Sequence, residues 1–321
     1  MKKFFAALLA AGTLFTASIV NAEIRTYEGT DEYIMSEFET PDVAKQRAKQ
    51  KAERMAIEKA GVFIESTTEV SNMMVTKDEI ITMTGGILKL VDVPQYQMIP
   101  LENGETFRVR ATVKAQIDTD DITKWLNRGL SERSELVKQN QELQRAMEEQ
   151  DKQIAELKAR LANAGTAQEK EKISEQFAAE DKTFLANQQL AEALRFYAGG
   201  NLNGALQSCT QAISFDSTGG LAYSLRGTIY YQLGQYQNAI ADLSQAAAFN
   251  PSDEKIFYNR ALAHVKLQNY RAAAEDFTVA IQLNPNDADA YYNRALCFQR
   301  LHNFMQYNAD MAKARSLGYR N

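Results

Sequence analysis

The side chains best suited to chemistry in this sequence are groups that would bind a ligand. Six of them form two sets that repeat at one fixed interval: Tyr258, Asn259 and Lys266, then Tyr292, Asn293 and Arg300. An asparagine amide can donate and accept hydrogen bonds at a peptide backbone, and a lysine or arginine attracts a carboxylate. Leu262 and Leu296 repeat at the same interval and would add apolar surface. Residues of these types could contact a peptide or protein segment; the alternative is a solvated face.

Patterns typical of catalytic and metal sites are absent from the sequence. There is no Gly-x-Ser-x-Gly, no glycine-rich phosphate loop and no His-Glu-x-x-His. His264 and His302, the only histidines, have no nearby Cys or Asp at metal-ligand spacing, so we interpret them as structural or surface residues. We therefore expect no enzymatic activity, no metal and no cofactor.

A fixed sequence period organises the C-terminal part of the chain. Pro251 and Pro285 are one period apart and follow similar text, QAAAFN and VAIQLN. Windows of this length that start at 186, 220, 254 and 288 align one column of small residues: Ala193, Gly227, Ala261 and Ala295. Such a unit is predicted to be a pair of antiparallel helices, which buries its apolar face only by stacking on its neighbours.

These columns, with the openings FYNRA (257–261) and YYNRA (291–295), resemble the tetratricopeptide repeat. The resemblance covers residues 186–321 and implies an all-α solenoid of about four helical pairs. It also implies that the first helix of each pair lines a concave groove, which would hold the eight residues named above. The resemblance to the family's carboxylate-clamp pattern is only partial. We therefore predict peptide or protein binding and do not specify a C-terminal carboxylate as the ligand.

Residues 130–165 carry a heptad pattern. Its two positions are occupied by Asn140, Met147, Ile154 and Leu161, and by Leu136, Leu143, Gln150 and Leu157. This spacing favours a coiled coil, so we expect a homodimer or homotrimer. The alternative is a lone amphipathic helix that lies on another domain. Residues 166–185 are predicted to be a helical linker.

Residues 23–128 mix strand and helix signals and predict an antiparallel α+β domain. The expected elements are a strand at 24–36, a helix from Pro41 to about Ile64, strands at about 67–76 and 86–98, a hairpin turn at Asn103-Gly104 and a strand from Phe107. The segments DVAKQRAKQKAERMAIEKAGVFIES and FRVRATVKAQID resemble the N-terminal domain of flagellar assembly protein T and related outer-membrane lipoproteins. That resemblance implies a role in a ring of the cell envelope.

Residues 1–22 have the pattern of a signal peptide. Lys2 and Lys3 precede a charge-free apolar run, and Val20-Asn21-Ala22 supplies the small residues of a cleavage site. We expect cleavage between Ala22 and Glu23 and a periplasmic or secreted mature chain without a membrane span. The alternative is that the apolar run remains as a membrane anchor.

The net charge of −5 gives no electrostatic reason to expect nucleic acid as a partner. Cys209 and Cys297 fall in different repeats, so we expect packed thiols, with a disulfide as the alternative. The favoured function is a periplasmic scaffold that binds an unidentified envelope protein or peptide. The alternative is a structural subunit of an envelope assembly such as a flagellar or outer-membrane ring, and an enzyme is the least favoured class.

Overall fold

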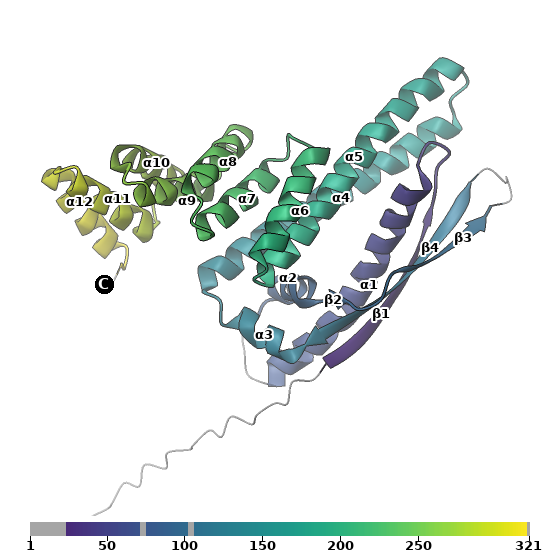
Figure 1. Ribbon diagram of the computed structural model, residues 1–321, viewed down its shortest axis with the longest axis horizontal. Helices are drawn as coiled ribbons and strands as arrows, with labels where there is room; N and C mark the ends of the chain where they lie inside the picture. The colour runs from purple at the N-terminus through teal and green to yellow at the C-terminus, as the bar shows by residue number, and fades with distance from the viewer. Residues whose placement is uncertain (1–23, 71–74, 102–105, 320–321) are drawn as a thin grey trace, which may run out of the picture.

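The computed structural model describes residues 24–70, 75–101 and 106–319. Figure 1 shows a sheet with one long helix against it, then a projecting pair of helices, and then a row of shorter helices. The signal peptide predicted for residues 1–22 lies outside the described residues. No helix in the described part of the chain is long and apolar enough to cross a membrane.

The N-terminal sheet is antiparallel and is organised around its longest strand, β4 (Phe107–Asp118). β1 (Ile24–Ile34) pairs along one side of β4, while β2 (Lys89–Leu90) and β3 (Gln95–Pro100) pair along the other. The predicted turn at Asn103-Gly104 lies outside the described residues. The antiparallel α+β prediction for this region is confirmed by the strands and helices described here.

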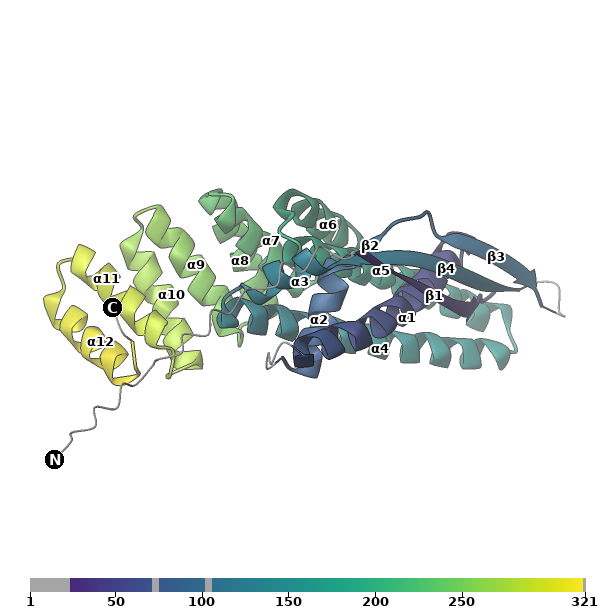
Figure 2. The same cartoon turned by 90° about the horizontal axis from the view of Figure 1, so that it is seen from below.

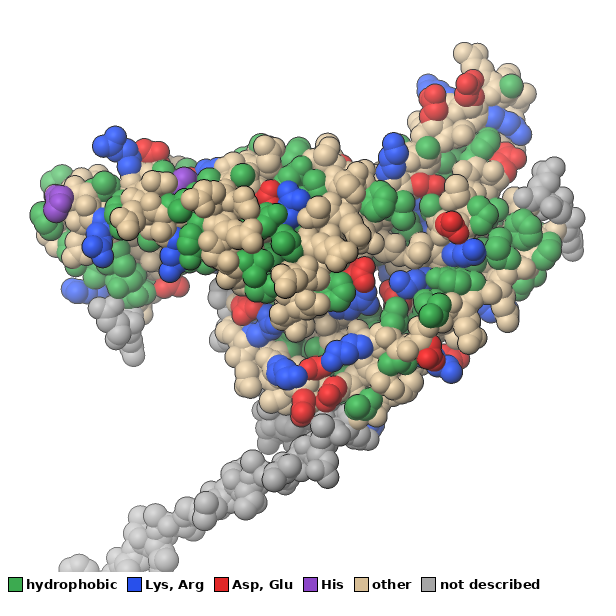
Figure 3. Space-filling model, in the orientation of Figure 1, with side chains coloured by type: hydrophobic (Ala, Val, Ile, Leu, Met, Phe, Trp, Pro, Cys, Tyr) green, Lys and Arg blue, Asp and Glu red, His purple; other side chains and the backbone are tan. Residues whose placement is uncertain are grey.

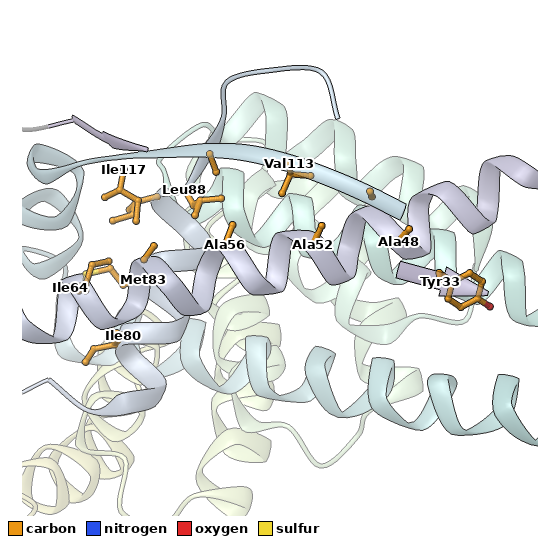
Figure 4. Packing of buried hydrophobic residues seen from close by; sticks show 14 of the residues in the cluster. Tyr33, Ala48, Ala52, Ala56, Ile64, Ile80, Met83, Leu88, Val113 and Ile117 are labelled. Atoms are coloured by element: carbon orange, nitrogen blue, oxygen red, sulfur yellow. The ribbon is translucent and has the colours of Figure 1, made fainter. Parts of the chain in front are cut away.

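One face of the sheet is covered by α1 (Pro41–Val70), whose contact stripe consists of alanines. Ala48, Ala52 and Ala56 are fully buried against β4 residues such as Val113 (Figure 4). Small side chains let the helix approach closely: a Cβ added at Gly29 of β1 would lie 1.9 Å from the Ala52 carbonyl oxygen. The alanine stripe therefore places α1 directly on the sheet.

The strand predicted at 67–76 is wrong. α1 continues to Val70, and α2 (Lys77–Ile87) begins soon afterwards. Thr76 caps α2: its side chain accepts from the Glu79 amide, and the Glu79 side chain accepts from the Thr76 amide. This capping box marks the start of α2, a helix that was not predicted from the sequence. α3 (Thr119–Leu126) then follows β4 and buries Trp125.

The heptad segment is one helix, α4 (Leu130–Ala162). Its apolar stripe is not left exposed for packing against a second copy of the chain. The stripe is buried within the same chain, mainly by α5 (Ala167–Ala198), which runs back beside α4 (Figure 1). Leu136 and Leu143 cluster with α5 residues such as Leu190, while Leu157 clusters with Phe177. The expectation of an intermolecular coiled coil through 130–165 therefore lacks its physical basis. The alternative, an amphipathic helix lying on the rest of its own chain, fits the structure.

The helix pair is fixed to the N-terminal domain by a buried cluster of charges. Glu39 accepts from the Ser36 amide at 2.7 Å and pairs with Arg47 at 3.2 Å and with Lys158 of α4 at 3.5 Å. Arg47 also pairs with Asp181 of α5 at 3.1 Å. The sheet, α1, α4 and α5 thus meet at one charge-balanced group, since each cation faces a carboxylate.

α5 is continuous across residues 185 and 186, so the predicted linker and the first repeat helix are parts of one helix. The remaining helices pair in succession and lead away from the N-terminal domain (Figure 2). They are α6 (Leu202–Phe215), α7 (Gly220–Gln232), α8 (Tyr236–Phe249), α9 (Glu254–Lys266), α10 (Tyr270–Leu283), α11 (Ala288–Arg300) and α12 (Phe304–Ser316). The small residues of the predicted column, Ala193, Gly227, Ala261 and Ala295, are all buried.

Candidate peptide-binding groove

The structure places the eight predicted site residues on two adjacent first helices, α9 and α11. Lys266 and Arg300 are exposed at the C-terminal ends of these helices. The other six are half-buried: Tyr258, Asn259, Leu262, Tyr292, Asn293 and Leu296. Half-burial means that part of each side chain is exposed while the rest packs against its neighbours.

Hydrogen bonds join successive first helices through these residues. The Asn293 amide nitrogen donates to the Tyr258 hydroxyl at 3.0 Å, and the Asn259 amide nitrogen donates to the Thr228 hydroxyl at 3.3 Å. One repeat earlier, Gln232 donates to the Tyr197 hydroxyl at 2.7 Å. The asparagine donors that the sequence suggested for a peptide backbone thus have partners within the chain. Their side-chain oxygens are the atoms with which they would accept from a ligand.

Tyr258 is held rigidly between the two sides of its own helical pair. Its ring meets Phe277 of α10 edge-on, with centroids 5.5 Å apart and an interplanar angle of 72°. Burial raises the pKa of its hydroxyl, and the nearby Asp289 and Asp287 carboxylates add to that rise. The hydroxyl therefore stays protonated and can donate a hydrogen bond from the wall.

Tyr292 is partly covered by the C-terminal end of the chain. Tyr319 stacks on its ring with centroids 4.1 Å apart and planes 17° apart. Tyr319 occupies the position that Pro251 and Pro285 hold in the earlier repeats. The stack covers part of the Tyr292 ring.

A series of arginine–aspartate pairs, called the arginine ladder below, was not predicted from the sequence. Three arginines of the first helices each form a two-pronged pair with an aspartate of the second helix in the same repeat: Arg226–Asp242, Arg260–Asp276 and Arg294–Asp310. A third nitrogen of each guanidinium reaches a hydroxyl of the preceding repeat: Thr210, Ser244 and Thr278. Both partners recur at the interval that separates Pro251 from Pro285, which is the signal that would have revealed them.

The histidines and cysteines have structural positions. His302 occupies a left-handed turn with φ 57°, equivalent to Gly234 with φ 76°. His264 lies 4.0 Å from Asp276, and burial lowers its pKa. Burial raises the pKa of Cys209 to about 12 and that of Cys297 to about 11, and both are free thiols. Among the described residues, no group of three or more His, Cys, Asp or Glu side chains is placed to hold a metal.

Sequence models described as TPR repeat and tetratricopeptide repeat match residues 227–268 and 258–304, respectively. The chain carries tetratricopeptide repeats. A search of curated proteins finds no match. The predicted resemblance of residues 23–128 to flagellar assembly protein T stays a prediction.

Solved structures similar to this chain include a crystal structure of MamA, with 20% identity, coverage of 44% of this chain and 83% of that chain, and a TM-score of 0.41. The Arabidopsis OM64 TPR domain has 23% identity, coverage of 37% and 98%, and a TM-score of 0.36. The first TPR domain of human RPAP3 has 22% identity, coverage of 40% and 98%, and a TM-score of 0.36.

The tetratricopeptide groove is covered at its N-terminal end. Leu190 and Leu194 occupy the columns of Tyr258 and Leu262, two repeats upstream, and each is only 6% exposed. Both belong to the same buried cluster as Leu136 of α4. The concave columns of repeat one are therefore used to dock α4, whereas the same columns of repeats three and four remain partly open.

Polar contacts fix this cover in place. The Arg128 guanidinium donates to the main-chain oxygens of Tyr197 and Ala198 at 3.3 and 2.5 Å. Lys138 of α4 pairs with Asp253, which caps α9, at 3.2 Å. These contacts hold Arg128 and α4 against α5 and the start of α9.

Proposed function

We propose that this protein binds a protein or peptide partner along the first helices of its tetratricopeptide repeats. The observation that carries the proposal is the partly open wall on α9 and α11, where Tyr, Asn and Leu columns repeat beside Lys266 and Arg300. Aromatic and arginine side chains are frequent anchors at protein interfaces. On the visible face of Figure 3, acidic and basic side chains are interspersed rather than gathered into one basic patch.

We further propose that the protein acts in the periplasm after cleavage between Ala22 and Glu23. The support is the basic, apolar and small-residue order of residues 1–22. N-terminal sequencing of the protein recovered from a periplasmic fraction should begin at Glu23. Recovery of the uncleaved chain in the membrane fraction would support an anchor instead.

The binding proposal is tested by crosslinking in intact envelopes, identification of the captured partner and measurement of its affinity. Replacing Asn259, Asn293 and Arg300 together with alanine should weaken partner binding by about 0.5–1.5 kcal/mol for each asparagine hydrogen bond lost and by about 1.5–3 kcal/mol for a charged hydrogen bond to Arg300. The matched control replaces the same residue types on the exposed surface of second helices: Asn238, Asn308 and Arg315.

Loss of affinity in the groove variant, with unchanged affinity in the control and unchanged helicity in both, is the expected result. Equal affinity of the groove variant and the wild type would contradict the proposal. It would indicate that the partner binds the N-terminal domain instead. That result would favour the alternative function, a structural subunit of an envelope assembly.

A further inference from the structure

The concave face offers a ligand much less room than four repeats would suggest. At repeat one, Leu190 and Leu194 are buried with Leu136, and a Cβ added at Gly86 of α2 would lie 2.7 Å from the Ala198 Cβ. At repeat four, Tyr319 lies on Tyr292. The open wall therefore extends only over the first helices of repeats two to four, α7, α9 and α11.

We propose that this open wall takes a short, extended segment with an acidic side chain at Lys266 and Arg300. The proposal rests on the proposed function and names the partner's chemistry. Adjacent packed helices lie about 8–10 Å apart, so three of them span about 20 Å. An extended chain advances about 3.3 Å per residue, which gives room for about six residues.

The cover on repeat one prevents a longer segment from continuing along the groove. To reach Leu194, a ligand would have to remove Leu136 from its buried cluster. It would also have to break the hydrogen bonds from Arg128 to the main chain of Tyr197 and Ala198. A segment on repeats two to four meets none of these costs.

The acidic preference follows from one column of the repeats. This column contains Ala198, Gln232, Lys266 and Arg300, so its positive charges lie on α9 and α11 of the open wall. Lys266 and Arg300 are exposed, and among the described residues neither forms an ion pair. The acids near this wall lie at the N-terminal ends of the helices: Asp253 is paired with Lys138, and Asp289 is exposed at the start of α11. Because Lys266 and Arg300 lie at the C-terminal ends of α9 and α11 and Asp289 lies at the N-terminal end of α11, an acidic side chain of the segment would point toward the C-terminal ends.

The test is selection from random heptapeptide and 15-residue peptide libraries on the purified full-length protein. We expect selected peptides to be enriched in Asp and Glu, and six-residue cores to bind as tightly as the longer peptides that contain them. Lys266→Glu/Arg300→Glu should weaken binding about tenfold or more because it places acids opposite acids. The matched control, Arg271→Glu/Arg315→Glu, reverses exposed charges on second helices and should leave binding unchanged.

The outcomes separate this inference from the proposed function. Peptides without acidic enrichment, or with a core of a dozen residues, would overturn the inference. The proposed function would survive that result if those peptides lose affinity when Asn259 and Asn293 are replaced with alanine. Failure to select any peptide that depends on groove residues would overturn both.

Discussion

Asn293 donates a hydrogen bond to the Tyr258 hydroxyl 3.0 Å away, and this bond joins the first helices of repeats three and four across the candidate groove. The same asparagine nitrogen also donates to the main-chain oxygen of Asp289 at 2.9 Å, which fixes the amide orientation. A ligand that accepted a hydrogen bond from this nitrogen would have to displace one of the two partners. The side-chain oxygen is therefore the atom through which Asn293 would bind a peptide.

Removing the Asn293 side chain should lower stability by about 0.5–1.5 kcal/mol, the usual net value of one hydrogen bond. Tyr258→Phe should cost a similar amount, because it removes the acceptor and leaves the ring on Phe277. Urea unfolding of the two variants and of the double variant measures the coupling. Fully additive losses would show that the two side chains do not interact in solution.

Each pair of the arginine ladder should stabilise the array more than the hydrogen bond between Asn293 and Tyr258 does. Arg260 is 20% exposed and Asp276 is 9% exposed in their side chains, so their pair is only partly screened by water. Asp276→Asn should cost about 1.5–3 kcal/mol, the range for a hydrogen bond to a charged group. Asp289→Asn changes an exposed acid on α11 and serves as the control, with an expected change below about 0.5 kcal/mol. Equal unfolding midpoints for both variants would contradict a structural role for the ladder.

The repeat columns were predictable because helix contact imposes a steric requirement that the sequence shows directly. Ala261 and Ala295 recur where two helices cross, and both are fully buried. The alanine stripe of α1 was predictable for the same reason. Arg260 and Asp276 also recur at the repeat interval. Charged side chains on helices are usually exposed to solvent, however, so this recurrence alone did not indicate a buried ion pair.

The partner of the heptad stripe could not be predicted from spacing. Leu136 and Leu157 recur as they would in a coiled coil, but spacing shows only that a stripe is covered and says nothing of which chain covers it. The decisive contacts come from Leu190 and Phe177 of α5, which lie far along the sequence. The resemblance to the tetratricopeptide repeat implied a groove along every first helix, whereas at repeat one that face packs against α4.

The left-handed turns between paired helices give a test of backbone strain. Gln268 and His302 have φ 60° and 57° at positions where earlier repeats have glycine. His302→Gly should stabilise the protein by about 0.5–1 kcal/mol, because strain of about 1–3 kcal/mol is relieved while the unfolded chain gains freedom. Gly234→Ala should destabilise it by about 1 kcal/mol. A lower urea midpoint for His302→Gly would show that the contact of the imidazole with Phe304 outweighs the strain.

The packing of the heptad stripe within the chain gives an expectation for the oligomeric state. Leu136, Leu143 and Leu157 are 2–6% exposed in the single chain, so most of the apolar surface of the stripe is already buried. We therefore expect light scattering to give the mass of one chain over a range of concentrations. A dimer or trimer that dissociates when exposed residues such as Lys152 and Glu149 are reversed in charge would show that another face of α4 joins the copies.

The cluster around Glu39 should decide whether α4 and α5 stay on the N-terminal domain. The Glu39 side chain is fully buried and faces two cations, Arg47 and Lys158, while Asp181 pairs with Arg47. Tyr33 also donates to Glu39, and burial raises the pKa of that hydroxyl. Glu39→Gln keeps the shape but leaves one positive charge in excess in a buried site.

Breaking a buried pair by neutralising one partner typically costs about 3–5 kcal/mol, because the other charge remains without compensation. We expect Glu39→Gln to lower the stability by about that amount and to speed hydrogen exchange in α4 and α5 near Lys158 and Asp181. Lys158→Met in the Glu39→Gln background should restore part of the loss, since it removes the excess charge. Glu149→Gln, whose partner Lys152 is 71% exposed, should change stability by less than about 0.5 kcal/mol. If Glu39→Gln were as mild as Glu149→Gln, the cluster would contribute nothing to docking, and the apolar contacts of α4 and α5 alone would hold the groove covered.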